Sequence, residues 1–430
     1  MSDAQYKKSP WIGSTTVYEV NIRQYTKEGT FNAFVPELAR LKDMGVETLW
    51  FMPITPISKK NKKGSLGSYY ACSDYVSVSC EFGTATDLKN LIDRAHAMGF
   101  KIIMDWVANH TGWDHVWTKT NPEYYQTDPA TGDFKMASGM EDIIELDFKN
   151  PALRKAMIDA MQYWVTDYSI DGFRCDLAFW VELDFWKEAR MALEKTATLF
   201  WLGEFDPLEN PAYAEVFDAS YTWTWMNKAA EFYKGAEGLN TLKVILEQYQ
   251  QVCGTGHIPA WFTSNHDENS WNGTEYEKYG DMARSLAVFG FTWDGLPLIY
   301  SGQELPNTKR LEFFEKDTIA WDRNNALHEF YKILSSLKKN KQALLAGDKK
   351  NTTHLLKNLA NENCFGYIRV SENDAVLVLL NWSKETISFR LTDEAAFGNY
   401  SNVFSGIENS FNTDSFFEMS PWEFLVYEKR

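Results

Sequence analysis

The strongest constraint on the fold is a repeated alternation of short apolar runs with longer amphipathic stretches. Strands that alternate with segments of helical periodicity form parallel βαβ units. Eight such units predict an α/β fold of the TIM (β/α)8 barrel type, whose active site lies at the carboxyl ends of the strands. The predicted strands lie within residues 14–22, 46–54, 101–107, 170–178, 197–205, 216–222, 257–265 and 296–304.

Two parts of the chain depart from this alternation. The segment after the third predicted strand is rich in Gly, Pro, Asn and Asp and is longer than an ordinary loop, which indicates a short inserted subdomain. Toward the C-terminus, apolar residues alternate with period two and no helix intervenes, which is typical of an antiparallel β domain. We expect a catalytic barrel at 1–109 and 149–344, an inserted subdomain at 110–148 and a C-terminal β-sandwich domain at 345–430.

Composition excludes several classes of protein. The net charge of −16 argues against a nucleic acid partner, which needs basic surface. The sequence has no run of about 18 apolar residues, so we predict no transmembrane helix and expect no membrane association. Five cysteines without metal-ligand spacing, and an N-terminus without an apolar signal segment, favour reduced thiols and a cytoplasmic protein. The mature form of a periplasmic or secreted protein would have the same features, and the oligomeric state is not predicted.

One predicted strand carries both signs of charge. In "GFRCDLAFW" (172–180), Arg174 and Asp176 are two positions apart within an apolar run, so they point to the same face. Buried charges are tolerated when they are paired, and they are enriched where chemistry happens. Arg174 is expected to keep Asp176 ionised. A structural ion pair is the alternative interpretation.

Acidic, amide and histidine side chains also follow three other predicted strands, and a barrel brings all four strand ends to one mouth. A structural role readily explains one such group, but it explains polar groups at the ends of four strands less well. Asp206 and Glu268 are expected to be structural or subsite groups. The full set beyond Arg174 and Asp176 is Asp105, Asn109, His110, Glu204, Asp206, His266, Asp267 and Glu268.

Four segments resemble, in order and spacing, the signature regions of the α-amylase family of glycoside hydrolases. They are "DWVANH" (105–110), "GFRCDLAFW" (172–180), "GEFD" (203–206) and "FTSNHDEN" (262–269). Further resemblance covers nearly the whole predicted barrel, through residues 68–84, 145–151, 297–304 and 310–321. The β-rich tail is similar to the C-terminal domain of that family.

The resemblance implies specific roles. Asp176 matches the nucleophile and Glu204 the acid/base, and retaining cleavage places these two carboxyl groups about 5–5.5 Å apart. The acid should have a raised pKa, which partial desolvation would supply. Asp267 matches the third carboxylate, which binds sugar hydroxyls. Asp105 and Asn109 are expected to support these groups. The remaining substrate-binding residues implied by the resemblance are Tyr70, His110, Arg174 and His266.

Seventeen tryptophans are many for 430 residues. Three of them follow predicted strand ends, where an aromatic face suits the apolar face of a glucose ring. Trp180, Trp223 and Trp271 are therefore candidates for subsite contacts, and core packing is the alternative for each.

The sequence departs from the family pattern near the usual calcium site. Phe179 and Trp180 stand where the family places a Lys-His pair, whose histidine helps to hold calcium, and Glu145 replaces an aspartate. We expect no required cofactor. Calcium remains an optional ion, with Asn109 and Glu145 as its candidate ligands.

These features predict a retaining glycoside hydrolase that cleaves α-1,4-glucosidic bonds in starch-like glucans or maltooligosaccharides. We expect an endo-acting α-amylase, because the insertion is short and the aromatic candidates are spread over several strand ends. A cyclomaltodextrin-cleaving or maltogenic hydrolase and a 4-α-glucanotransferase share every catalytic residue and stay open. A catalytically dead carbohydrate-binding homologue is the alternative outside enzymes, and the three retained carboxylates argue against it. "KDTIAW" (316–321), in place of the "ARTPMQW" of relatives that cleave α-1,6 ends, favours α-1,4 cleavage.

Overall fold

Eight parallel strands close into a barrel, in the order β1-β10-β9-β8-β7-β6-β3-β2 around the ring. The computed structural model describes residues 6–253, 256–321, 325–357, 359, 363–372 and 374–430. Each strand lies within one of the eight predicted segments, so the predicted barrel is confirmed. The strands are β1 (Val17–Val20), β2 (Thr48–Phe51), β3 (Lys101–Trp106), β6 (Gly172–Cys175), β7 (Phe200–Gly203), β8 (Ala219–Tyr221), β9 (Ile258–Trp261) and β10 (Leu296–Tyr300).

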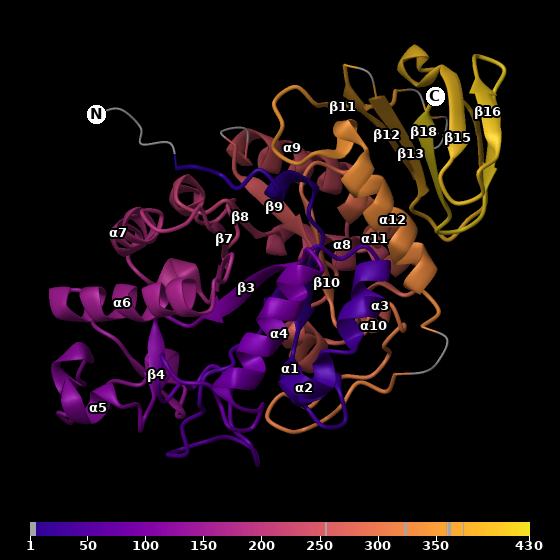
Figure 1. Ribbon diagram of the computed structural model, residues 1–430. Helices are drawn as coiled ribbons and strands as arrows, with labels where there is room; N and C mark the ends of the chain where they lie inside the picture. Colours follow the sequence, from indigo (N-terminus) through magenta and orange to yellow (C-terminus); the bar gives the residue numbers. More distant parts are fainter. Residues whose placement is uncertain (1–5, 254–255, 322–324, 358, 360–362, 373) are drawn as a thin grey trace.

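Amphipathic helices surround the barrel (Figure 1). Helix α4 (Ala85–Ala97) begins at a capping box, in which Thr84 accepts from the Asp87 amide and Asp87 accepts from the Thr84 amide. Its apolar stripe is buried, as the helical spacing predicts. The other helices of eleven or more residues are α6 (Pro151–Asp167), α7 (Leu183–Leu193), α8 (Trp223–Tyr233), α9 (Leu239–Cys253), α11 (Met282–Thr292) and α12 (His328–Asn340). The shorter ones are α1 (Ile22–Tyr25), α2 (Phe31–Phe34), α3 (Glu37–Asp43), α5 (Trp117–Thr120) and α10 (Glu275–Tyr279).

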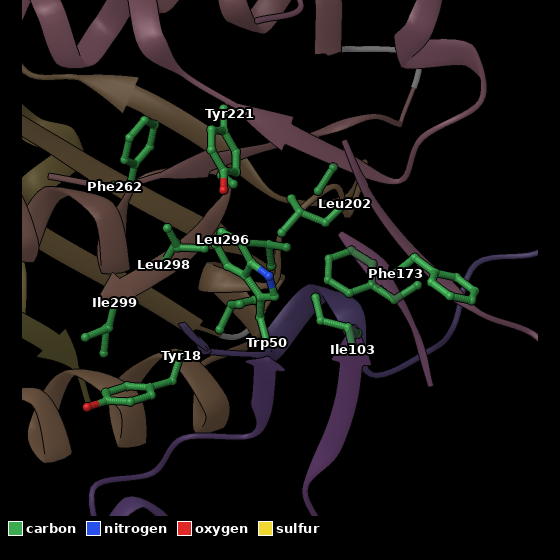
Figure 2. Close-up of a cluster of buried hydrophobic side chains, with 14 of the residues drawn as sticks. Tyr18, Trp50, Ile103, Phe173, Leu202, Tyr221, Phe262, Leu296, Leu298 and Ile299 are labelled. Carbon is green, nitrogen blue, oxygen red and sulfur yellow. The ribbon is translucent and has the colours of Figure 1, made fainter. Parts of the chain in front are cut away.

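Large side chains fill the interior of the barrel. Figure 2 shows Trp50 of β2 and Tyr221 of β8 reaching toward each other among aliphatic and aromatic residues, and their ring centroids lie 6.3 Å apart. These strands stand on opposite sides of the ring, so the contact crosses the barrel. Because the interior is packed, the polar residues at the strand ends meet at the mouth.

The segment between β3 and β6 forms a small antiparallel ladder. Strand β4 (His110–Gly112) pairs with β5 (Ile143–Glu145), so that His110 lies opposite Glu145. The ladder stands beside the mouth because β4 begins four residues after β3 ends. We propose residues 110–148 as the bounds of this inserted subdomain.

The C-terminal strands form antiparallel sheets, as predicted, in yellow in Figure 1. Strands β12 and β13 are buried on both faces rather than on alternate residues. One face joins the core of the barrel, where Phe365 and Trp382 lie near Phe289 of α11, and the other covers a separate apolar cluster. The larger sheet contains β11 (Thr352–Leu355), β12 (Cys364–Ser371), β13 (Asp374–Asn381), β18 (Phe424–Lys429), β15 (Gly398–Asn402) and β16 (Glu408–Phe411), and the smaller one contains β14 (Ile387–Arg390) and β17 (Phe416–Met419). Within the described ranges, every helix is too short or too polar to cross a bilayer.

Candidate active site

One fully buried arginine organises the acidic groups at the mouth. Nη1 of Arg174 donates to Asp176 Oδ1 at 2.9 Å and to Asp105 Oδ1 at 3.0 Å. Nη2 of the same guanidinium lies 2.7 Å from Glu204 Oε1. The predicted Arg174–Asp176 pair therefore forms, and it extends to Asp105 on β3 and to Glu204 just after β7. Asp176 and Glu204 lie on one guanidinium, one at each terminal nitrogen.

A second network joins the third and seventh predicted strands to the first. The Tyr70 hydroxyl donates to Asp105 Oδ2 at 3.1 Å and lies 2.8 Å from His266 Nε2. The Tyr70 and His266 rings stack, with their centroids 5.3 Å apart. His266 Nδ1 in turn lies 2.5 Å from a carboxylate oxygen of Glu19, on β1. Each polar contact fixes the orientation of a side chain that faces the mouth.

Some of these groups border a pocket of about 340 Å³ at the carboxyl ends of the strands, whereas Asp105, Arg174 and His266 are not among the residues that line it. Asp176, Glu204 and Asp267 all line it, as do Tyr70 and His110. The carboxylates predicted from three separate motifs therefore open into one cavity, which is large enough for a sugar-sized ligand.

Burial raises the pKa values of Asp176 and Glu204 to different extents. It raises the pKa of Asp176 to about 6, against the opposing effect of the Arg174 charge. It raises the pKa of Glu204 further, to about 8, and Arg174 again opposes the shift. At neutral pH, Asp176 is ionised and Glu204 is protonated. The pair thus offers a nucleophile and an acid at the same time.

The other titratable groups at the mouth differ in charge. Burial raises the pKa of Asp267, but the charge of His266 outweighs this effect and the net pKa is lowered. Burial lowers the pKa of His266, and the carboxylates of Asp267 and Glu19 outweigh it to leave the pKa well above its usual range. His110 has its pKa lowered to about 4 by burial, so it is neutral. Its Nε2 is buried without a hydrogen-bond partner among the described residues, and His110 lines the pocket, so this nitrogen is available to a ligand there.

The three tryptophan candidates occupy different places. Trp271 lines the pocket, is 53% exposed and donates to Asp267 Oδ1 at 3.2 Å. Trp180 is 36% exposed and lines a neighbouring pocket of about 380 Å³ together with Asn109. Trp223 packs against Tyr221, with ring centroids 5.0 Å apart, and is not among the residues that line either pocket.

The two residues left as structural or subsite groups are held by protein contacts. Asp206 accepts hydrogen bonds from the Thr224 amide at 2.7 Å and from the Tyr249 hydroxyl at 2.6 Å. Glu268 pairs with Lys278 at 2.8 Å. We infer a structural role for both carboxylates, since each is already engaged within the protein.

The candidate calcium ligand Glu145 is already paired within the protein. Lys135 Nζ lies 2.7 Å from Glu145 Oε2, and Gln126 Nε2 donates to the other oxygen at 3.2 Å. The side-chain amide nitrogen of Asn109 is directed to His110 Nδ1 at 3.3 Å. An ammonium group therefore already neutralises the carboxylate that would bind the ion, and it would repel a second cation.

We expect chelator to change the Tm and the activity only modestly. An ion bound at 100 times its Kd would add about 2.7 kcal/mol of stability, and its removal would lower the Tm by several degrees. Thermal unfolding with EDTA, with calcium and with neither checks this expectation. A large drop in Tm that calcium restores would contradict the inference from Lys135.

Some residues of the site are not identified by the sequence motifs. Glu19 could have been found, because "TVYEV" carries a charge within an apolar strand, the same signal that marks Arg174. Lys63, Asp142 and Phe313 also line the pocket. They come from loops, where no strand periodicity indicates which way a side chain points.

Comparisons with known proteins agree with this geometry. Residues 18–134 and 120–350 match the family described as alpha amylase, catalytic domain. Alpha-amylase MalA of Haloarcula japonica is 27% identical over 88% of this chain, which spans 57% of that relative's length. A cyclomaltodextrinase of Geobacillus thermopakistaniensis is 23% identical over 93% of this chain and 70% of its own. The crystal structure of a noncanonic maltogenic alpha-amylase, AmyB, from Thermotoga neapolitana superposes with a TM-score of 0.88 at 28% identity, covering 97% of this chain and 99% of that one.

Proposed function

The chain belongs to the α-amylase family of glycoside hydrolases, and from this membership we propose that it hydrolyses α-1,4-glucosidic bonds in starch-like glucans or maltooligosaccharides with retention of configuration. The observation that carries the proposal is the pair of carboxyl groups held by Arg174. Asp176 and Glu204 contact the two terminal nitrogens of one guanidinium, at 2.9 and 2.7 Å. This arrangement suits the short separation, about 5–5.5 Å, that a double displacement needs.

The two carboxyl groups take different roles. The Asp176 carboxylate attacks the anomeric carbon as the bond to the leaving oxygen breaks, and the proton of Glu204 passes to that oxygen. Glu204, now ionised, takes a proton from water, which attacks the same carbon and releases Asp176. The raised pKa of Glu204 supports the first step, since the acid must hold its proton until the bond breaks.

Several neighbours position the sugar. Asp267, at the open side of the pocket, accepts hydrogen bonds from sugar hydroxyls. Neutral His110 offers a further hydrogen bond. Tyr70 and Glu19 hold the charged His266, whose Nε2 lies 3.4 Å from Asp267 Oδ2 and so supports that carboxylate. Trp271 presents an apolar face beside them. These contacts orient the glycosidic bond between Asp176 and Glu204.

Product stereochemistry tests this proposal. Proton NMR of a fresh digest of maltooligosaccharides should show α-anomers first, because two displacements invert the anomeric carbon twice. β-Anomers appearing first would exclude the double displacement. A purified, folded protein without activity on starch, pullulan, cyclodextrin and maltooligosaccharides would favour the binding homologue instead.

The dependence of kcat/KM on pH should be bell-shaped. Below about pH 6, Asp176 takes up a proton and the nucleophile is lost. Above about pH 8, Glu204 loses its proton and the acid is lost. Because kcat/KM reports the free enzyme, the maximum should lie between these limits. Initial rates measured at substrate concentrations below KM across this pH range check the result, and circular dichroism verifies folding at each pH. A kcat/KM that stays constant through both limits would contradict the pKa assignments.

Two relatives favour a second candidate within the same chemistry. One is a cyclomaltodextrinase and another a maltogenic alpha-amylase. A preference for cyclodextrin or for short chains over starch would place this chain with them, and transfer of glucan to an acceptor sugar would indicate a transferase. All three activities share Asp176 and Glu204.

A further inference from the structure

The loop of residues 57–72, between β2 and α4, spans one side of the pocket; it is called the mouth loop below. At one end it is fastened to the inserted subdomain. Asp114 Oδ2 accepts hydrogen bonds from the amides of Lys59 and Lys60, at 3.0 and 3.2 Å. Lys63 Nζ contacts Asp142 Oδ1 at 2.8 Å. Backbone contacts therefore hold the loop, and one ion pair joins it to the subdomain directly at the pocket.

The mouth loop is fastened equally well to the segment after β10. The amide of Leu66 donates to the carbonyl oxygen of Phe314 at 3.2 Å, and the amide of Ser65 donates to Glu315 Oε1 at 2.7 Å. Gly64 has a φ of +61°, and a Cβ there would lie 2.5 Å from Cβ of Phe314. The two segments thus approach so closely that only glycine fits between them.

Together these segments form a continuous wall around part of the pocket. Lys63, Asp142 and Phe314 all line the cavity. The Asp142 side chain is only 6% exposed, so its charge depends on Lys63 for compensation. A wall made of three fastened segments resists displacement by a glucan chain.

The contacts of the acid bear on which part of the substrate meets this wall. Glu204 Oε2 accepts a hydrogen bond from the Leu177 amide at 2.6 Å, and η4 (Ala178–Trp180) follows directly. In the proposal below, the leaving group, which receives the proton of Glu204, lies on the side of η4, where Trp180 lines the neighbouring pocket. The sugar attacked by Asp176 is there placed on the side of the mouth loop, whose Lys63 lines the same pocket as Asp176.

We propose that the mouth loop, secured by the Lys63–Asp142 ion pair, closes the pocket against the non-reducing end of the glucan. The inference rests on the proposed function and specifies its substrate. The glucan is cleaved at a fixed distance from its non-reducing end, and the products are short maltooligosaccharides of one dominant length. Such cleavage differs from the internal cleavage that the short insertion and the spread of aromatic candidates led us to expect from the sequence.

A pair of matched substrates tests the wall. One is p-nitrophenyl maltoheptaoside, and the other is the same compound with a benzylidene group on O4 and O6 of its non-reducing glucose. The bulky group collides with a closed wall but leaves internal bonds free. We expect kcat/KM for the blocked substrate to be at least about tenfold lower in the wild-type protein, the range in which a shaped pocket discriminates.

Variants locate the effect. In Lys63→Ala and in Asp142→Asn, the ratio of blocked to unblocked kcat/KM should rise by about fivefold. Lys59→Ala is the control, because Lys59 is an exposed lysine of the same loop that does not line the pocket, and its ratio should stay at the wild-type value. If one pocket variant fails to fold, the other variant and the wild-type ratio still decide.

The outcomes separate the two proposals. Equal cleavage of both substrates by the wild-type protein, with an early fall in starch viscosity, would overturn the wall and leave the proposed function standing. If the folded wild-type protein cleaves neither substrate, the proposed function itself is contradicted. An equal rise of the ratio in Lys59→Ala would remove the ion pair from the explanation.

Discussion

Glu204→Gln is expected to lower kcat on maltooligosaccharides by about 10²–10⁴-fold, the usual contribution of a positioned general acid. Asp176→Asn is expected to lower it by at least about 10³-fold, because an amide cannot form the covalent intermediate. Both side chains are buried and share the Arg174 guanidinium, and both substitutions keep the shape of the side chain. Steady-state kinetics on purified variants, with the Tm as a measure of folding, check these values.

An activated substrate distinguishes the two roles. Fluoride needs little protonation to leave, so Glu204→Gln should still react rapidly with α-maltotriosyl fluoride in the first step. Asp176→Asn should not, since its defect is the missing nucleophile. The opposite pattern would exchange the assigned roles.

Asp218→Asn provides a matched control for the two carboxylate variants. Asp218 is as buried as they are and is also paired with an arginine, Arg190, at 2.9 Å, but it does not line the pocket. It should lose stability while the folded protein keeps its kcat. A comparable loss of kcat in this control would show that general destabilisation, rather than chemistry, explains the effect.

Arg174→Met should have the largest effect on stability. The substitution leaves Asp105, Asp176 and Glu204 without the cation that they share. Removing one partner of a buried ion pair costs about 3–5 kcal/mol. We expect a loss of this size in the free energy of unfolding, measured by denaturant titration. Activity should fall as well, because Asp176 without Arg174 takes up a proton at higher pH and the acid limb of the pH profile moves upward.

Arg190→Met separates these two consequences. Arg190 is equally buried and pairs with Asp218 and Glu194, at 2.9 and 2.6 Å. It should be destabilised to a similar degree, but its pH profile should match that of the wild-type protein. An unchanged acid limb in Arg174→Met would contradict the role of Arg174 in setting the charge of Asp176.

The sequence alone determined the barrel and the composition of its mouth. Strand and helix periodicities are local, so segments such as 101–107 and 170–178 could be identified without tertiary information, and closure of eight βα units follows from their number. Once the strands are placed, the geometry of the fold brings their carboxyl ends together. Asp176, Glu204 and Asp267 were therefore predicted to meet, and they line one pocket.

Tertiary structure decided the walls of that pocket and the partners of its charges. The contact of Glu19 with His266 joins residues 247 positions apart, and the Lys63–Asp142 pair joins two loops. Loop side chains follow no period, so their direction depends on packing against neighbours that the local sequence does not specify. The same holds for Lys135, whose ammonium group occupies the carboxylate of a candidate calcium ligand. The charged groups at the mouth were thus readable from strands and motifs, whereas the shape of the pocket arises only when separate loops pack together.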